Sequence, residues 1–355
     1  MPVILEIEDF IDKFDKEIYR DEKILLIDVR SEKEFDHAHI PGAINIPLLN
    51  NEHRHLVGIE YKKKGREAAV ALGFELVGPH FHEFIKKVNE LTDKKEVMIY
   101  CWRGGMRSSI MSWLLSMAGY QTLLLKGGYK SFRRIILSQF SIQKKIMIVG
   151  GHTGSGKTEI LNEMKKTGEQ VIDLEGMANH RGSAFGQLGL PPQPTNEFFE
   201  NLLGCLWRKI DSKKTVWLEA ESHSIGQIKI PDEVFMQLQS APLIELICSR
   251  EFRKKRILEE YGVFPKNELA ECTIKLRKRL GNLRLTEALN ALDQDRLSDW
   301  LEVLIEYYDK TYSHSLQERK STKKISIEVN DGEKMNELAK RLVELSSMQT
   351  ENSIT

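Results

Sequence analysis

The sequence has few of the features that mark secreted, membrane-spanning or nucleic-acid-coating proteins. It contains 4 cysteines in 355 residues, none of them in a CxxC pair, which argues against a disulfide framework and a structural zinc site. No apolar run approaches the roughly 18 residues that a membrane span needs. Lysine plus arginine equals aspartate plus glutamate at 52 each, so a polyanion would have to bind at a local patch.

The composition that remains is that of an ordinary globular protein. Hydrophobic residues make up 41% of the chain and charged residues 29%, and the length favours two domains. The first residues place acids directly after a short apolar run, unlike a secretory or transit peptide. We therefore expect a cytoplasmic protein.

Apolar runs and helical patterns alternate in two series. The first series predicts strands at 24–29, 96–101 and 122–128, with helical stretches around 79–91 and 107–118. Such alternation indicates a mainly parallel sheet covered by helices. The second series begins after a polar hinge and predicts strands at 145–151, 170–174, 215–220, 242–248 and 324–329.

These patterns predict the domain boundaries. We expect one α/β domain over 1–140 and a second over 141–345, which becomes helical and highly charged after residue 250. The polar tail 346–355 is expected to be disordered.

A cysteine loop follows the strand at 96–101. Cys101 stands at the strand end, and Arg107 opens the next helical pattern. Backbone N–H groups of the loop then point into one concavity at a helix N-terminus, where an anion and a thiolate are both favoured. Gly104 and Gly105 permit the tight backbone, and Arg103 and Arg107 can contact an oxyanion. A buried, inert strand-end cysteine is the alternative.

A second anion loop follows the strand at 145–151. GHTGSGKT (151–158) fits the G-x-x-x-x-G-K-[ST] pattern of phosphate-binding loops, and Thr158 would ligate Mg²⁺ if a metal takes part. Glu219 and Glu221 end a later strand where nucleotide hydrolases usually carry aspartate, so ATP is not established. The residues predicted to bind phosphate or diphosphate are Gly151, Gly154, Ser155, Gly156, Lys157 and Thr158.

Basic residues gather in two later stretches, 250–256 and 275–281. Both could follow a nucleic-acid backbone, although their helical spacing and neighbouring acids are equally typical of a solvated face. The loop 180–189 adds Arg181 as a phosphate contact and Phe185 as a stacking ring, or is an ordinary glycine loop.

Three His-x-His pairs could suggest a metal. In a strand the two histidines of a pair would share one face, but none has nearby ligands in a recognised spacing, so no metal site is expected. The pairs are His37/His39, His53/His55 and His80/His82.

The first domain resembles the rhodanese superfamily. LIDVRSEKEFDHAHIPGAINIPL (26–48) is similar to the rhodanese signature, and the resemblance implies that Cys101 is a chalcogen carrier. Common sulfurtransferases have four residues between the cysteine and the closing arginine, whereas WRGGM makes five. That spacing is also found in cell-cycle phosphatases of this fold, so sulfur, selenium and phosphate chemistry stay open.

The whole chain resembles the tRNA 2-selenouridine synthases. The motifs YCWRGGMRS, GGHTGSGKT, NHRGSAFG, PPQPTNEFFEN and WLEAESHSIG follow one another in that order between about residue 20 and about residue 345. The resemblance implies an α/β protein, in which a rhodanese-like parallel-sheet domain precedes a P-loop NTPase-like α/β domain with a helical C-terminal part.

The resemblance also implies an activity and its substrates. Such enzymes replace the sulfur of wobble 2-thiouridine in tRNA by selenium from selenophosphate, through an S-geranyl intermediate made from geranyl diphosphate. Cys101 and Arg107 would be catalytic, and Arg103, Gly104 and Gly105 would bind selenophosphate. The P-loop would hold the diphosphate, with no tightly bound cofactor. The expected tRNA contacts are Arg181, Lys254, Lys255 and Arg256.

Two other functions stay open on the residues alone. One is a CX5R phosphatase or a sulfurtransferase fused to a P-loop kinase. The other is a binding protein whose rhodanese module is inactive, against which the intact Cys101, Arg103 and Arg107 argue.

Overall fold

The computed structural model describes residues 2–18, 24–317, 319, 323–330 and 332–351. The chain divides into two compact units. Unit 1 comprises Met1–Gln139 with Glu200–Cys205, and unit 2 comprises Phe140–Phe199 with Leu206–Thr355. Helix α10 (Asn196–Lys209) therefore contributes residues to both units.

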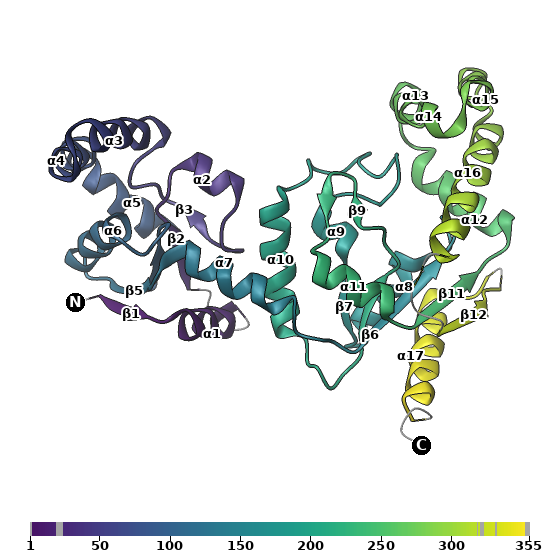
Figure 1. Ribbon diagram of the computed structural model, residues 1–355, viewed down its shortest axis with the longest axis horizontal. Coiled ribbons are helices and arrows are strands. Elements are labelled where there is room, and N and C mark those ends of the chain that lie inside the picture. Colours follow the sequence, from purple (N-terminus) through teal and green to yellow (C-terminus); the bar gives the residue numbers. More distant parts are fainter. Residues whose placement is uncertain (1, 19–23, 318, 320–322, 331, 352–355) are drawn as a thin grey trace. The chain divides into compact units, whose positions relative to one another are not determined.

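Unit 1 is built on a parallel sheet of five strands in the order β1-β5-β4-β2-β3 (Figure 1). The central strands form because their apolar runs are buried on both faces, as in other parallel sheets. The strand bounds are β1 (Val3–Leu5), β2 (Leu25–Asp28), β3 (Ile44–Asn45), β4 (Glu96–Tyr100) and β5 (Gln121–Leu125).

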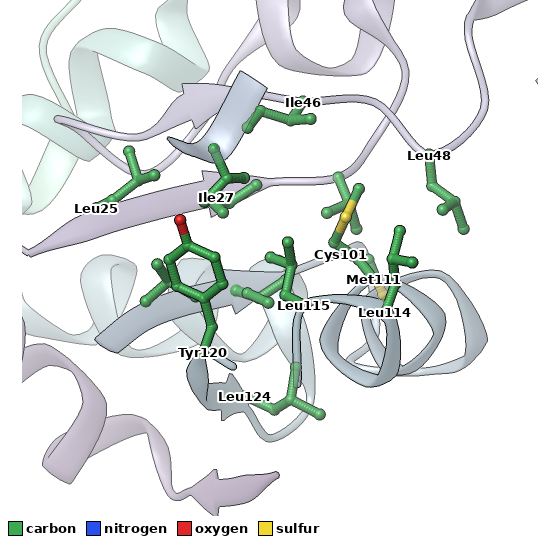
Figure 2. Packing of buried hydrophobic residues seen from close by; sticks show 14 of the residues in the cluster. Leu25, Ile27, Ile46, Leu48, Cys101, Met111, Leu114, Leu115, Tyr120 and Leu124 are labelled. Atoms are coloured by element: carbon green, nitrogen blue, oxygen red, sulfur yellow. The ribbon is translucent and has the colours of Figure 1, made fainter. Parts of the chain in front are cut away.

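Helices cover this sheet and close its core. Figure 2 shows side chains of β2, β4, β5 and α6 meeting in one apolar cluster that includes Cys101. The helices of unit 1 are α1 (Ile7–Ile18), α2 (Glu32–His37), α3 (Asn51–Lys64), α4 (Arg66–Val77), η1 (Gly78–His80), α5 (Phe81–Leu91), α6 (Met106–Met117) and α7 (Gly128–Gln139).

Unit 2 repeats the principle with a second parallel sheet, in the order β12-β11-β6-β8-β7. Its central strand leads into the phosphate loop, as expected from the sequence. A short antiparallel pair, β9 (Ser224–Ile225) with β10 (Ile228–Lys229), follows the acidic strand end. The sheet strands are β6 (Ile146–Gly151), β7 (Gln170–Ile172), β8 (Val216–Glu219), β11 (Leu243–Ile247) and β12 (Lys324–Glu328).

The helices of unit 2 form two groups. Helices α8 and α17 pack on the sheet around one apolar cluster, and the helices after β11 build a second cluster around Trp300. The remaining helices of unit 2 are α8 (Lys157–Lys166), α9 (Leu174–Ala178), α11 (Asp232–Ser240), α12 (Arg250–Tyr261), α13 (Lys266–Lys275), α14 (Arg277–Leu280), α15 (Asn282–Asp293), α16 (Leu297–Gln317) and α17 (Met335–Glu351).

The α/β class, the parallel sheets and the helical C-terminal part are confirmed. The expectation of a disordered tail at 346–355 is wrong for its first part, because α17 continues to Glu351; residues 352–355 lie outside the described residues. No helix within the described ranges has the length and apolar character to cross a bilayer.

Candidate functional site

The thiol of Cys101 lies at the carboxyl edge of the unit 1 sheet. Cys101 directly follows β4, and α6 begins five residues later at Met106. The residue is only 3% exposed. The Gly105 N–H donates to Sγ at 3.3 Å, and the Ser108 hydroxyl oxygen lies 3.2 Å from Sγ. The sulfur is therefore embedded in the core on one side and held by the first turn of α6 on the other.

The start of α7 fixes the shape of the thiol loop. The Tyr129 N–H donates to the carbonyl of Cys101 at 2.8 Å, and the Lys130 N–H donates to the carbonyl of Trp102 at 3.0 Å. Gly128 has a φ of 60°, and a Cβ there would lie 2.2 Å from the Cys101 carbonyl oxygen. Only glycine fits such a close approach of two backbones.

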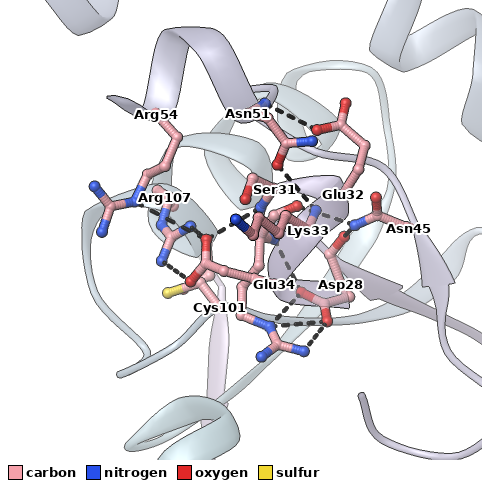
Figure 3. A network of polar contacts seen from close by, with 12 residues as sticks. Asp28, Ser31, Glu32, Lys33, Glu34, Asn45, Asn51, Arg54, Cys101 and Arg107 are labelled. Carbon is pink, nitrogen blue, oxygen red and sulfur yellow. Dashed lines mark hydrogen bonds and ion pairs between the residues drawn. The ribbon is translucent and has the colours of Figure 1, made fainter. Parts of the chain in front are cut away.

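Arg107 is anchored by a carboxylate. Its guanidinium donates two hydrogen bonds to Glu34, at 2.6 and 3.2 Å, as Figure 3 shows. Burial alone would raise the pKa of Glu34, but the hydrogen bonds and charge of Arg107 outweigh it and lower that pKa. Arg103, by contrast, is exposed. The two arginines predicted to hold an oxyanion thus differ in mobility and in net local charge.

A buried ion pair supports the neighbouring strand end. Arg30 and Asp28 are 1% and 0% exposed, and their charged groups meet at 2.7 Å. Arg30 also donates to the Ala38 carbonyl at 2.6 Å and lies 4.1 Å from the centre of the Tyr129 ring. The Asp-Val-Arg part of the rhodanese-like signature is therefore a brace beneath the loop and does not line an open site.

The phosphate loop of unit 2 has the backbone that its sequence predicts. Gly151, Gly154 and Gly156 have φ values of 145°, 82° and 85°, which L residues rarely adopt. The Lys157 ammonium donates to the Gly151 carbonyl at 3.1 Å and lies 3.5 Å from Glu219. The Thr158 hydroxyl donates to the same carboxylate at 3.0 Å. Glu219, flagged in the sequence, therefore holds both polar side chains of the loop.

Two more carboxylates join Glu219. Oxygens of Glu175, Glu219 and Glu221 lie within 4.8 Å of one another. Burial and then the charge of Glu219 raise the pKa of Glu175 from 4.5 to about 8. Burial and then Glu175 raise the pKa of Glu221 well above its usual range. With the Thr158 hydroxyl these oxygens are hard ligands that suit Mg²⁺.

The same groups line a cavity of about 910 Å³. Its wall also carries Arg181, Arg256 and several tyrosines. The sequence analysis missed Glu175, although it follows the predicted strand 170–174 and so had to reach the same sheet edge as Glu219. The rule that carboxyl ends of parallel strands share one edge would have found it.

The residues predicted to contact tRNA have mixed surroundings. Arg181 pairs with Glu260 at 2.9 Å, and Lys254 pairs with Glu302 at 3.1 Å. Arg256 pairs with Glu159 on α8, whereas Lys255 is exposed. In the second basic stretch, the exposed side chains are those of Lys275, Arg277, Lys278 and Arg279.

The structure corrects two expectations. Phe185 cannot serve as a stacking ring, because it is 4% exposed and packs edge-on against Tyr261 and Trp300. The His-x-His pairs do not lie in strands. Residues two apart on a helix point in different directions. The six histidines lie on or beside the helices α2 (His37, His39), α3 (His53, His55), η1 (His80) and α5 (His82).

Comparison with known proteins agrees with this architecture. Residues 11–135 match the rhodanese-like domain, and residues 144–344 match the family described as tRNA 2-selenouridine synthase AAA domain. Proteins named tRNA 2-selenouridine synthase from Hydrogenovibrio crunogenus, a Sulfurovum species and Bdellovibrio bacteriovorus are 36%, 35% and 35% identical to the chain. The alignments cover 83%, 83% and 85% of this chain and 90%, 90% and 91% of those proteins. The chain belongs to the tRNA 2-selenouridine synthase family.

Proposed function

We propose that this chain is a tRNA-modifying enzyme that replaces the sulfur of wobble 2-thiouridine by selenium, using selenophosphate and passing through S-geranyl-2-thiouridine. One observation carries the proposal. Each unit presents an anion-binding loop at the carboxyl edge of its own parallel sheet, and only one of the two loops contains a thiol. Two different anionic substrates and two chemical steps fit two such loops.

The geranyl step fits the loop of unit 2. There the thiocarbonyl sulfur bonds to C1 of geranyl diphosphate, the C1–O bond breaks, and diphosphate leaves while the base loses its N3 proton. Gly151, Gly154, Ser155 and Gly156 would cradle the diphosphate, and Lys157 would neutralise its growing charge. Thr158 and Glu219 would hold Mg²⁺, which would supply further positive charge to the leaving group.

The selenium step fits the loop of unit 1. Water takes the phosphoryl group as the P–Se bond of selenophosphate breaks. A C2–Se bond forms, the C2–S bond breaks, and the sulfur leaves as geranyl thiol, so no oxidant is needed. The loop N–H groups around Gly104 and Gly105, together with Arg103, would bind the selenophosphate oxyanion beside Cys101. Arg107, anchored by Glu34, would direct its remaining donors at the same anion.

The tRNA backbone would be bound by exchange of partners. Arg181, Lys254 and Arg256 each have a carboxylate neighbour that a phosphate would replace, whereas Lys255 is exposed and can contact a phosphate directly. The exposed lysines and arginines of 275–279 extend this basic surface. Binding of this kind depends strongly on salt.

A second function is favoured by one observation, the five residues between Cys101 and Arg107. In this alternative the thiol loop hydrolyses a phosphate ester and the P-loop phosphorylates a substrate. Phosphate release from an aryl phosphate, lost in Cys101→Ser, would support it and would count against selenium transfer.

The deciding experiment is nucleoside mass spectrometry. The full chain is given tRNA containing 2-thiouridine, geranyl diphosphate and selenophosphate, and the products are compared with those of Cys101→Ser and Lys157→Ala. Cys101→Ser should accumulate S-geranyl-2-thiouridine and lose selenouridine about 1,000-fold or more. Lys157→Ala should lose the geranyl step about 100-fold or more. Lys166→Ala, on the exposed side of α8, should match wild type.

A wild-type protein that forms neither modified nucleoside would refute the proposal. Equal loss of both steps in both variants would refute the assignment of one step to each loop.

A further inference from the structure

Unit 1 contains a second cavity, next to the thiol loop. It has a volume of about 330 Å³, which is at the lower end of the about 300–1,000 Å³ found for ligand sites. The walls come from α3, α4, the start of α6 and the loop before α3. Apolar side chains dominate the lining, among them Leu48, Leu49, Val57, Val70, Phe74 and Ile110.

The cavity and the cysteine share one structural neighbourhood. Leu48 and Leu49 belong to the same buried cluster as Cys101, and Val57 and Ile110 pack against that cluster. Figure 2 places Leu48 and Cys101 in one view of it. Met106 and Arg107, which end the thiol loop and begin α6, are themselves part of the cavity lining. A ligand in the cavity would therefore lie against the loop that carries the thiol.

Charge at the cavity is of one sign. Its charged lining residues are Arg54, Arg66 and Arg107, and no carboxylate lines it. Such a site suits an apolar chain that is attached to an anionic group. The cavity beside the P-loop is different, because the carboxylates of Glu175, Glu219 and Glu221 line it. Facing those carboxylates would cost an apolar chain most of the benefit of leaving water.

We propose that the unit 1 cavity holds the geranyl chain of S-geranyl-2-thiouridine tRNA during the selenium step. This inference rests on the proposed function and assigns the chain a site that the P-loop does not offer. When the C2–S bond breaks and the C2–Se bond forms, the departing sulfur carries the chain away as geranyl thiol. Holding the chain beside the thiol loop aligns the breaking bond, while the arginines face the phosphates of the tRNA.

Gly73 provides a way to fill the cavity. It lies in α4, lines the cavity, and a Cβ built there meets no atom within 4 Å. The exchange Gly73→Leu adds apolar bulk without creating a backbone clash, and leucine favours a helix. Ala71→Leu is the matched control, because Ala71 is exposed on the same helix and does not line the cavity.

The test starts from purified tRNA that already carries the S-geranyl nucleoside, mixed with selenophosphate and the full-length protein. Gly73→Leu should convert it to selenouridine at least tenfold more slowly than wild type, and Ala71→Leu should match wild type. With an S-methyl nucleoside in place of the S-geranyl one, wild type and Gly73→Leu should differ less than twofold. A merely structural defect would slow both substrates equally.

Two outcomes would overturn the inference: wild-type conversion of the S-geranyl substrate by Gly73→Leu, or equal slowing of both substrates. Failure of the proposed function is separately recognisable, because wild type would then convert neither substrate. In that case calorimetry with geraniol decides whether the cavity takes a prenyl chain. Binding that is at least tenfold tighter for wild type than for Gly73→Leu would support a prenyl site, and equal or absent binding would refute it.

Discussion

The two anion loops of this protein use the same backbone device for different chemistry. Both follow a central strand of a parallel sheet, both turn through glycines with positive φ, and both lead into a helix. In unit 1 the loop surrounds a buried sulfur and its arginine is anchored by one carboxylate. In unit 2 the loop carries a lysine among three carboxylates. The backbone thus selects an anion, and the side chains decide what happens to it.

The largest expected effect separates backbone shape from side-chain chemistry in unit 1. Gly128→Ala places a Cβ 2.2 Å from the Cys101 carbonyl oxygen, so the thiol loop must move. We expect selenouridine formation to fall about 100-fold or more, since displacement of about 1 Å has such costs. Gly105→Ala is the control: its Cβ meets nothing within 4 Å, and the N–H that donates to the sulfur remains. Equal activity of the two variants would show that loop shape is not limiting.

The second prediction uses pH to oppose the two loops. Arg107 holds the pKa of Glu34 low despite its burial, so its stabilising contribution is present near neutrality and is lost as the pH falls through that lowered pKa. The pKa of Glu175 is raised from 4.5 to about 8. Its contribution is therefore present below about 4.5 and is lost as the pH rises through about 8.

The measurement is the free energy of unfolding between pH 3 and pH 9, in EDTA. Glu175→Gln should flatten the decline on the alkaline side, where one such group accounts for up to about 1.4 kcal/mol per pH unit. Glu34→Gln should flatten the decline on the acid side and leave the alkaline side unchanged. Alkaline flattening by Glu34→Gln would contradict the assignment.

The smallest expected effect concerns the basic surface of unit 2. Replacing Lys275, Arg277 and Lys278 by glutamine should reduce the slope of log affinity for tRNA against log salt by about 2 to 3, because each lost phosphate contact reduces it by about 1. The corresponding change at Lys254, Lys255 and Arg256 should be smaller, since two of these side chains already pair with carboxylates. A larger change at 254–256 would reverse this ranking.

The central parts of the fold followed from sequence because they are local. Every strand predicted from an apolar run is present in the two sheets, since burial on both faces leaves a continuous apolar signature. Strands β1 and β3 were missed because they have three and two residues. Helices α3 and α4 were missed because their apolar residues do not follow a clear helical period, as the polar run Tyr61–Lys64 and the apolar run 68–74 illustrate.

The candidate sites were predictable only in part, because their contacts join distant residues. The anchor of Arg107 is Glu34, 73 residues away, and no local pattern links the two. Phe185 reads as an exposed ring in a glycine loop, yet it is buried by Tyr261 and Trp300 from the helical region. Burial is decided by the whole fold, whereas spacing reports only on neighbours.

The contact of Glu219 with Lys157 and Thr158 gives the P-loop a charge threshold. Because Lys157 already has a negative partner at 3.5 Å, a singly charged anion would only exchange one partner for another and would lose its own hydration. A ligand with several negative charges gains more, since it also engages the loop N–H groups that the carboxylate does not reach. The loop therefore discriminates by ionic valence: simple monoanions in the cell are poor competitors, and polyanionic ligands are selected before any of their other features are sensed.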